Sequence, residues 1–391
     1  MDLHQTYPAL GDLKRRAERR LPRFVWDYLD SATGTEAVMA WNRAALDRVG
    51  FMPSILHGPI APDTSTRFMG HDFALPVGIA PVGMSGLIWP EAEILLAQSA
   101  AKAGLPYCLS TVAARAPEDV APHLGKHGWF QLYPPKDETI RKDMLARAWD
   151  AGFTGLVLTA DVPNASLRER QTRSGLTSPP QLTPRLLAQI LMRPAWAWGM
   201  RGERGIRMRT LDKYSDIKTS LPPTEHIGYL LRTSPDWAYV DWLRAHWAGD
   251  LIVKGVLCDT DAGRLEQAGV DAIWVSNHTG RQFDAAPATL SVLPKIRSKT
   301  RLPLIFDSGI EGGLDILRAL AFGADFVMLG RGFHYALAAL GEVGPDHLIE
   351  ILQRDMVSNM GQIGAHDLSQ LPPPFLLDDW REMTSFCSAE P

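Results

Sequence analysis

The sequence predicts an α/β fold, a closed (β/α)8 (TIM) barrel. Short apolar runs recur along the chain, and continuous runs of this length are typical of strands buried on both faces of a parallel sheet. Stretches rich in alanine, leucine and charge, such as 91–103 and 140–151, separate most of these runs and indicate βαβ units. Eight such strands favour a closed barrel. They are predicted at 76–84, 106–111, 128–133, 155–161, 251–256, 272–277, 303–308 and 326–331.

The length of the chain agrees with one barrel that carries insertions. Its 391 residues are 46% hydrophobic, and a barrel with insertions reaches this size as a single domain. We expect a helical segment over 1–60, in which Pro22 begins a helix, and an insertion over 162–250 after the fourth strand. A helix is predicted over 344–361, and an extended tail over 365–391.

Composition excludes several function classes. A net charge of −4 gives none of the basic surplus of a nucleic-acid-binding domain. The three cysteines, Cys108, Cys258 and Cys387, form no CxxC pair, so we expect a reduced compartment without a zinc site or disulfide framework. Neither a GxGxxG that opens a first βαβ unit nor a P-loop is present.

The apolar segments do not predict a membrane span. The N-terminus lacks a basic stretch followed by an apolar one, so no signal peptide is expected. The most apolar run, 73–89, contains two prolines and three glycines and is interpreted as a buried strand with its loop. We therefore expect a cytoplasmic protein.

The insertion has one distinctive stretch, 181–210. It carries six arginines against the single acid Glu203, interleaved with Leu, Ile, Met and Trp. Such a mixture is typical of a membrane interface. A lid or a subunit contact with solvated arginines is the alternative. Peripheral contact with the inner face of the cytoplasmic membrane is therefore one expectation for this stretch.

Polar residues end seven of the predicted strands. The carboxyl ends of barrel strands meet at one face, where active sites of this fold lie. These strand-end residues are therefore expected in one site: Ser110, Thr111, Gln131, Tyr133, Thr159, Asp161, Lys254, Ser276, Asn277, His278, Asp307, Gly330 and Arg331.

The run 276–284, Ser-Asn-His-Thr-Gly-Arg-Gln-Phe-Asp, resembles the signature of the FMN-dependent 2-hydroxy acid dehydrogenases and oxidases. This family includes glycolate oxidase, L-lactate dehydrogenase and mandelate dehydrogenase. The similarity covers roughly residues 8–365 and includes the motifs at 79–83, 130–133, 158–161, 253–255 and 329–331. The segments 109–112 and 193–198 most resemble those of the bacterial respiratory L-lactate dehydrogenases.

The resemblance implies FMN as cofactor and no metal. Lys254 would place positive charge near the flavin N1–O2 locus and stabilise reduced flavin. The phosphate would lie at the loops after the last two strands, with Arg331 as its charge partner. The full set of expected FMN contacts is Pro81, Val82, Gly83, Ser110, Gln131, Thr159, Lys254, Ser276, Asp307, Ser308, Gly309, Gly330 and Arg331.

The substrate residues follow from the chemistry as well as from the resemblance. Oxidising a 2-hydroxy acid requires a base, and His278 has the side chain suited to neutral pH. Asp161 would orient it and stabilise its imidazolium. The resemblance assigns Arg168 and Arg281 to the substrate carboxylate, which guanidinium binds in a bidentate way. It assigns Tyr28 and Tyr133 to hydrogen bonds with the substrate.

The chain departs from its relatives at two positions beside the expected site. Glu311 stands where relatives usually carry the arginine that contacts the phosphate. It turns outward, weakens FMN binding, or is compensated by another group. Thr279 stands where relatives usually have glycine, with an effect on loop conformation or pocket shape.

Two small residues predict the size of the substrate pocket. Val112 and Ala165 occupy positions where glycolate oxidase has Trp and Leu, so a larger side chain than that of glycolate is expected to fit. Insertion residues could refill the space.

The sequence thus predicts FMN-dependent oxidation of an L-2-hydroxy acid, L-lactate or a larger analogue such as L-mandelate, to the 2-oxo acid. Gly83 and the basic, Trp-rich insertion favour a quinone as electron acceptor. An oxidase that reduces oxygen to hydrogen peroxide, a flavin enzyme for a modified peptide or bulky hydroxy acid, and a scaffold that binds FMN weakly or not at all are the alternatives. A homotetramer is expected by resemblance.

Overall fold

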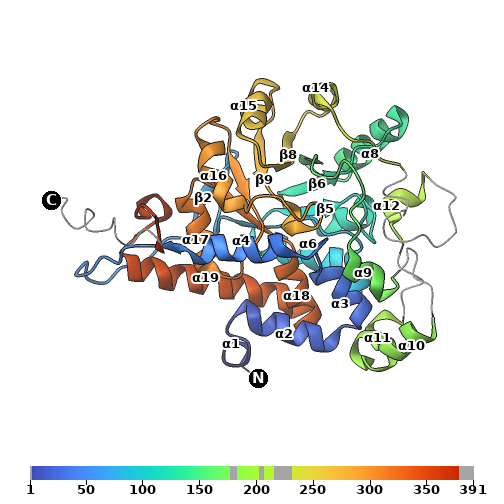
Figure 1. Ribbon diagram of the computed structural model, residues 1–391, viewed down its shortest axis with the longest axis horizontal. Helices are drawn as coiled ribbons and strands as arrows, with labels where there is room; N and C mark the ends of the chain where they lie inside the picture. Colours follow the sequence, from blue (N-terminus) through green and yellow to red (C-terminus); the bar gives the residue numbers. More distant parts are fainter. Residues whose placement is uncertain (1, 177–182, 202–206, 215–230, 378–391) are drawn as a thin grey trace.

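The computed structural model describes residues 2–176, 183–201, 207–214 and 231–377 (Figure 1). Its centre is a closed barrel of eight parallel strands in the order β10-β11-β4-β5-β6-β7-β8-β9. The predicted fold class is therefore confirmed. Each predicted run coincides with one strand of the barrel, and only the strand at 251–256 begins one residue earlier than predicted. The strands are β4 (Val77–Ile79), β5 (Tyr107–Ser110), β6 (Gly128–Leu132), β7 (Gly155–Thr159), β8 (Asp250–Val256), β9 (Ala272–Val275), β10 (Leu304–Phe306) and β11 (Phe326–Leu329).

Most of these strands are shorter than the apolar runs that predicted them. Tyr133, Asp161 and Asn277, for example, lie in the loops that follow β6, β7 and β9. The chain leaves the hydrogen-bonded ladder within a few residues of the first polar side chains. The carboxyl ends of the strands consequently present those side chains at one mouth of the barrel.

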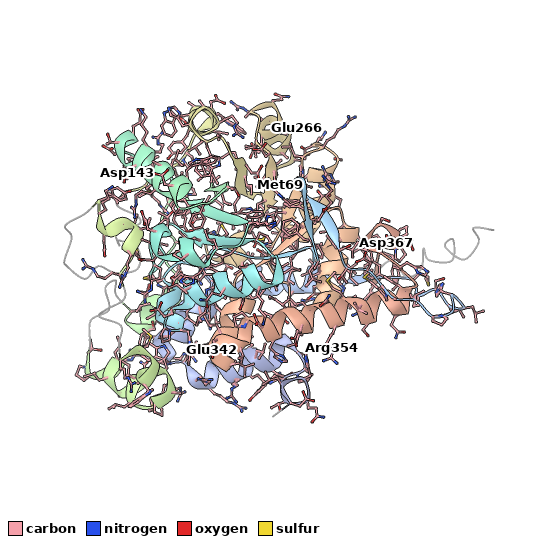
Figure 2. The ribbon with its side chains drawn as sticks, turned by 180° about the vertical axis from the view of Figure 1, so that it is seen from behind. Met69, Asp143, Glu266, Glu342, Arg354 and Asp367 are labelled. Atoms are coloured by element: carbon pink, nitrogen blue, oxygen red, sulfur yellow. The ribbon has the colours of Figure 1, made fainter. Side chains whose placement is uncertain are left out.

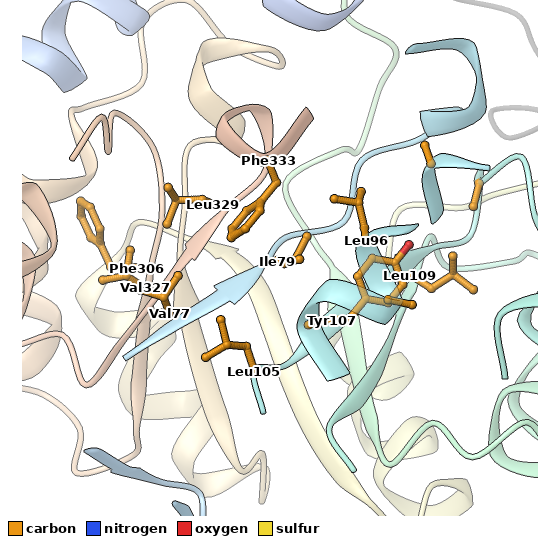
Figure 3. Close-up of a cluster of buried hydrophobic side chains, with 14 of the residues drawn as sticks. Val77, Ile79, Leu96, Leu105, Tyr107, Leu109, Phe306, Val327, Leu329 and Phe333 are labelled. Atoms are coloured by element: carbon orange, nitrogen blue, oxygen red, sulfur yellow. The ribbon is translucent and has the colours of Figure 1, made fainter. Parts of the chain in front are cut away.

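Two layers of apolar side chains bury the strands. The outer layer lies between strands and helices, and Figure 3 shows part of it around β4, β5 and β11. The inner layer includes Val157, Ile252 and Trp274 and continues to Phe68 and Phe73. These two phenylalanines come from a hairpin, β2 (Thr66–Phe68) and β3 (His71–Phe73), that packs on Phe326 at the start of β11. The hairpin therefore closes the end of the barrel opposite the carboxyl ends.

A ring of helices surrounds the barrel. Figure 2 shows Asp143 of α8, Glu266 of α15 and Arg354 of α19 on this outer ring. The helix predicted over 344–361 is confirmed as α19. The helices of the barrel proper are α5 (Ser85–Ile88), α6 (Ala92–Ala103), α7 (Pro117–Val120), α8 (Glu138–Asp150), α15 (Asp259–Gln267), α16 (Thr289–Arg297), α17 (Gly313–Ala321), α18 (Arg331–Leu340) and α19 (Gly344–Ile363).

The N-terminal segment is helical only to Asp47, as α1 (Leu3–Thr6), α2 (Leu10–Arg20), α3 (Arg23–Asp30) and α4 (Ala37–Asp47). Pro22 is the N-cap of α3, as the sequence predicts. The prediction of helix up to residue 60 is wrong beyond α4, because β1 (Val49–Gly50) pairs antiparallel with β12 (Phe375–Leu376). The tail is likewise not simply extended, since a 3-10 turn, Leu368–Gln370, precedes β12. Residues 378–391 of the predicted tail lie outside the described residues.

The insertion after β7 forms a helical cover over the N-terminal helices. Trp196 is buried, and its indole N–H donates to the Leu87 carbonyl over 3.1 Å. Gln189 accepts the Phe24 amide N–H, and Arg193 donates to the Leu21 carbonyl. Its helices are α9 (Glu169–Ser174), α10 (Pro184–Leu191), α11 (Pro194–Met200), α12 (Arg209–Asp212) and α14 (Trp237–His246). Among the described residues no helix has the length and apolar character of a membrane span.

Candidate active site

A cavity opens at the carboxyl ends of the barrel strands. It extends from Tyr133 and Arg168 to Gly330 and Arg331 at the start of α18. The residues predicted for catalysis, substrate or FMN all line it except Asp161 and Ser276, and the strand-end residues Thr111 and Asn277, also expected in this site, do not line it. Those that line it are Tyr28, Pro81, Val82, Gly83, Ser110, Gln131, Tyr133, Thr159, Arg168, Lys254, His278, Arg281, Asp307, Ser308, Gly309, Gly330 and Arg331.

Asp161 lies behind His278. Both carboxylate oxygens are 3.2 Å from His278 Nδ1, so the Nδ1 proton is donated to Asp161 and Nε2 is left with its lone pair. Burial raises the pKa of Asp161, but His278 and Lys254 outweigh burial and the net pKa is lowered. Burial lowers the pKa of His278, and Asp161 only partly reverses this, so the net pKa lies below its ordinary value. The pair is therefore a carboxylate and a neutral imidazole at pH 7.

Gly255 gives Asp161 the space it occupies. A Cβ built on Gly255 would stand 2.4 Å from the Cβ of Asp161. Gly255 has a φ of 100°, a conformation that glycine adopts without strain. The register of β8 against β9 shifts between Lys254 and Val256, which marks an irregularity at this glycine. The irregularity thus brings β8 under Asp161 while Lys254 points into the cavity.

Lys254 is a buried cation with defined partners. Its ammonium donates to Ser276 Oγ over 2.7 Å and lies 3.4 Å from Asp307 Oδ2. Ser276, predicted to contact FMN, is fully buried and does not line the cavity. It holds Lys254 in place, and its hydroxyl also accepts the His278 amide N–H over 3.1 Å.

Three predicted cofactor residues form a buried hydrogen-bond chain across neighbouring strands. Ser110 Oγ donates to Gln131 Oε1 over 3.0 Å, and Gln131 Nε2 donates to Thr159 Oγ1 over 2.9 Å. Each residue is the last or nearly the last of its strand, so their spacing follows the ladder of β5, β6 and β7. The chain fixes which way the glutamine amide faces and presents an ordered polar edge to a bound ring.

The two arginines predicted to bind the substrate, Arg168 and Arg281, are held by the N-terminal segment and the insertion. Arg281 Nη1 donates to the carbonyls of Tyr28 and Ser31, each over 2.9 Å, at the C-terminal end of α3. Tyr28 Oη in turn donates to the Gly83 carbonyl over 2.7 Å. Arg168 has a left-handed φ of 44°, and its Nε donates to Ser166 Oγ over 3.1 Å.

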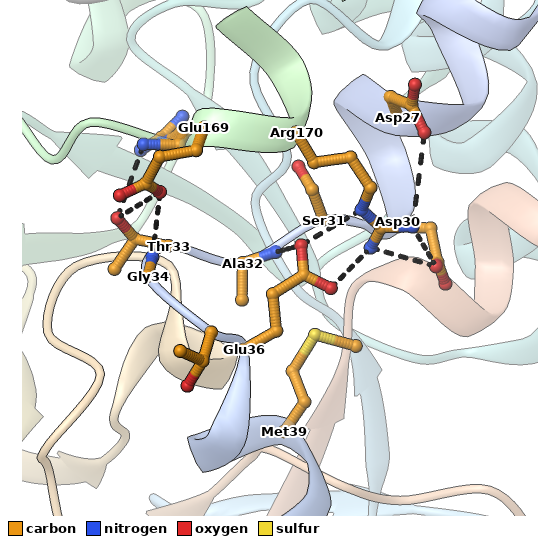
Figure 4. A network of polar contacts seen from close by, with 12 residues as sticks. Asp27, Asp30, Ser31, Ala32, Thr33, Gly34, Glu36, Met39, Glu169 and Arg170 are labelled. Atoms are coloured by element: carbon orange, nitrogen blue, oxygen red, sulfur yellow. Dashed lines mark hydrogen bonds and ion pairs between the residues drawn. The ribbon is translucent and has the colours of Figure 1, made fainter. Parts of the chain in front are cut away.

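A polar network holds the segment that follows Arg168 against the α3–α4 turn (Figure 4). Glu169 accepts the Gly34 amide N–H over 2.8 Å. Arg170 binds Asp30 over 3.1 Å and Glu36 over 2.9 Å. Because Arg168 directly precedes these two anchors, its backbone position is fixed.

The two departures from the family pattern take definite positions. Thr279 adopts a φ of 53°, the left-handed region that glycine enters at no steric cost, and its amide N–H donates to Ser308 Oγ over 3.2 Å. The threonine is thus tolerated at a glycine-type position. Glu311 is an exposed residue that still borders the cavity.

The pocket is not as open as the small residues predict. Val112 lines it, but Ala165 is exposed and does not, because the loop after β7 turns outward at this point. Insertion residues complete the wall instead, namely Gln171, Leu176, Met208 and Arg232. Arg232 is buried and lies 5.9 Å from the Tyr133 ring centroid. No motif signals these residues, because only the folded insertion brings them to the barrel mouth.

The donor set fits FMN. Lys254 offers positive charge and the Ser110–Gln131–Thr159 chain offers hydrogen bonds at the centre of the cavity. The positive φ values of Ser308 and Gly309 turn the loop after β10, and α18 begins at Arg331 with Gly330 as its N-cap. A helix N-terminus next to such a loop is suited to a phosphate.

Comparison with known proteins shows the family to which the chain belongs. The model of the FMN-dependent dehydrogenase family matches residues 17–378. The chain is 36% identical over 370 residues to an L-lactate dehydrogenase of Xanthomonas campestris pv. campestris (strain 8004), covering 93% of this chain and 95% of the relative. It is 38% identical over 368 residues to an L-lactate dehydrogenase of Caulobacter sp. (strain K31), covering 92% and 96%.

Solved structures with a similar fold include a mandelate dehydrogenase and a mandelate oxidase. The monotopic membrane protein (S)-mandelate dehydrogenase has a TM-score of 0.86 at 33% identity, over 93% of this chain and 97% of that one. A mandelate oxidase variant has a TM-score of 0.79 at 32% identity, over 95% and 98%. The chain is therefore an FMN-dependent oxidoreductase that belongs to the FMN-dependent dehydrogenase family.

Proposed function

We propose that the protein oxidises an L-2-hydroxy acid, L-lactate or a larger analogue such as L-mandelate, with His278 as the base and a membrane quinone as the electron acceptor. One observation supports this reaction. His278, paired with Asp161, lines the same cavity as Tyr133, Arg168, Arg281 and Lys254. A base, two guanidinium groups and a buried cation in one cavity are what oxidation of an anionic hydroxy acid needs.

The substrate carboxylate binds between Arg168 and Arg281. Arg281 is anchored through Nη1 on carbonyls at the C-terminal end of α3, and this contact holds its guanidinium at the wall of the cavity. Tyr28 and Tyr133 line the same cavity. A bidentate guanidinium contact orients the substrate so that its C2 and hydroxyl point towards His278.

His278 accepts one proton from the substrate. Its Nδ1–H is donated to Asp161, so Nε2 is the atom that takes up the proton. The imidazolium that forms is stabilised by the Asp161 carboxylate. This role is the same whether the proton comes from C2 or from the hydroxyl oxygen. FMN, when bound, supplies the acceptor for the two electrons, and Lys254 stabilises the negative charge that develops beside it.

Two helices of the insertion support the membrane part of the proposal. Leu187, Leu191, Met192 and Trp198 are exposed on or next to α10 and α11. Arg201 stacks on the Trp198 ring at 3.6 Å. An apolar face bordered by arginines suits the headgroup region of an anionic bilayer. Arg204, also part of the predicted basic stretch, lies outside the described residues. A homotetramer stays a prediction by resemblance.

The reaction is tested on purified protein by adding L-lactate, L-mandelate and glycolate without oxygen and following flavin absorbance. Loss of the oxidised flavin bands with one of these acids supports the proposal. His278→Gln should abolish this flavin reduction, and the variant should still bind the flavin. Rapid reoxidation by a quinone analogue and slow reoxidation by oxygen favour the dehydrogenase. The reverse order indicates an oxidase. If the flavin is bound but none of these acids reduces it, the substrate assignment is wrong. If the chain does not bind FMN, the alternative of a scaffold protein without FMN is supported.

Membrane binding is tested by sedimentation with vesicles. The protein should co-sediment with vesicles that contain anionic lipid, and a smaller fraction of it should co-sediment with neutral vesicles. Leu191→Asp should release it, whereas Trp149→Asp, at an exposed aromatic on α8, should not. Equal behaviour of the two variants argues against this face.

A further inference from the structure

We propose that Lys14, on α2, is a second cation for the phosphate of FMN and does there what the family's arginine does at the position of Glu311. The inference needs only that the chain binds FMN. It does not depend on the substrate or on the electron acceptor.

The loop after β10 supplies no cation to the cavity. Glu311 brings a negative charge to its border. The nearest arginines, Arg43 and Arg318, bind Asp315 over 2.7 and 2.8 Å, and Arg43 also binds Asp47 over 2.7 Å. Neither arginine lines the cavity. A phosphate with a charge of about −2 would therefore face Arg331 and Glu311, whose charges cancel.

Helix α2 closes the same end of the cavity with Leu10, Gly11 and Lys14. Residues four apart lie on one helical face, so Leu10 and Lys14 both point to α18. The Lys14 ammonium lies 5.5 Å from the ring centroid of Tyr335. Tyr335 is one turn beyond Arg331 in α18, which places the ammonium next to the first turn of that helix. Two cations and a helix N-terminus thus converge there.

Asp30 holds this cation in position. Its Oδ1 lies 3.3 Å from Lys14 Nζ and accepts a hydrogen bond from Tyr335 Oη over 2.7 Å. Its backbone carbonyl accepts a hydrogen bond from Arg331 Nη1 over 3.1 Å. Arg170 binds the other carboxylate oxygen. Asp30 therefore keeps two partners when Lys14 turns to share its protons with a phosphate.

The experiment compares FMN with riboflavin, which lacks the phosphate. Flavin is removed, and each flavin is titrated into the apoprotein while the quenching of its fluorescence is followed. Lys14→Met should raise the Kd for FMN by about 10- to 100-fold, the effect of one hydrogen bond to a charged group, and leave the riboflavin Kd within about two-fold. Lys14→Arg should retain most of the FMN affinity, and the dependence of log Kd on log salt concentration should be weaker in Lys14→Met.

Two further variants make the test specific. Arg15→Met, at the neighbouring exposed position whose guanidinium binds Asp12, is the matched control and should change neither Kd. Glu311→Arg should tighten FMN binding and should restore it in combination with Lys14→Met. Lys14→Gln, which keeps a hydrogen bond to Asp30, replaces Lys14→Met if that variant does not fold. An unchanged FMN Kd, or equal weakening of FMN and riboflavin, overturns the inference. Failure of every hydroxy acid to reduce the flavin would leave it standing, because no substrate takes part.

Discussion

Replacing Asp161 with asparagine tests the proposed base most directly. Asp161 does not line the cavity, so D161N should bind FMN and substrate nearly as the native protein does. What changes is the charge that faces His278 Nδ1 at 3.2 Å. Asparagine keeps the shape and one hydrogen-bond acceptor, but the imidazolium that forms during the reaction loses its counter-ion.

The size of the effect follows from burial. The two side chains are only 19% and 11% exposed, so the ion pair forms with little solvent screening. Removing one partner from a buried ion pair costs about 3–5 kcal/mol. Since about 1.4 kcal/mol corresponds to a factor of ten in rate, flavin reduction by the substrate should slow by about 10²- to 10⁴-fold.

The pH dependence separates this effect from general damage. The native rate should rise with pH as His278 loses its proton. In D161N the Coulombic attraction that raises the pKa of His278 is absent, so the acid limb should move to lower pH while the plateau falls. A loss of folding would lower the plateau without this displacement.

The assay is anaerobic stopped-flow reduction of bound flavin over a series of pH values. Asp250→Asn is the control, because Asp250 starts β8 at the opposite end of the barrel. It should leave the rate unchanged. A D161N rate within about three-fold of the native rate, or an acid limb displaced to higher pH, would refute the assignment of Asp161 as the counter-ion of His278.

Three further predictions concern the native pH profile and the walls of the pocket. The acid limb of kcat/KM should lie below the ordinary His pKa of about 6.5, because burial lowers the pKa of His278, and the rate should be nearly flat above neutrality. Arg281→Lys loses the Nη1 contacts with the Tyr28 and Ser31 carbonyls and the planar guanidinium proposed to bind the substrate carboxylate; kcat/KM should fall about 10- to 100-fold, mainly through KM, as steady-state kinetics would measure. Val112→Trp should lower kcat/KM for L-mandelate far more than for L-lactate, because Val112 lines the cavity.

The barrel could be predicted because its signals are local. Each strand is a short apolar run, and each run ends where polar side chains begin, so one pattern gives both the fold and the position of the mouth. The motifs that resemble the family then predicted most of the residues that line the cavity. Asp161, Ser276, Thr111 and Asn277 do not line the cavity, and the sequence has no signal that separates a residue facing the cavity from one that supports it.

The parts that could not be predicted depend on contacts between distant segments. The pairing of β1 with β12 joins residues 49–50 to 375–376, and two strands of two residues leave no periodic pattern. Arg232 reaches the pocket because the insertion folds back beside the loop after β6, where the Thr233 amide N–H donates to the Pro134 carbonyl over 2.7 Å. The misassigned Ala165 shows the converse, since a position matched by resemblance can turn away when the loop around it differs.

The C-terminal end of α3 joins the two ends of the cavity. The carbonyls of Tyr28 and Ser31 hold Arg281, proposed for the substrate carboxylate, and the carbonyl of Asp30 holds Arg331, proposed for the phosphate. Helix carbonyls without an intrahelical partner attract cations, so one helix terminus positions both guanidinium groups. The N-terminal helices are therefore part of the proposed active site, and a barrel that lacked them would lose the anchor of both arginines.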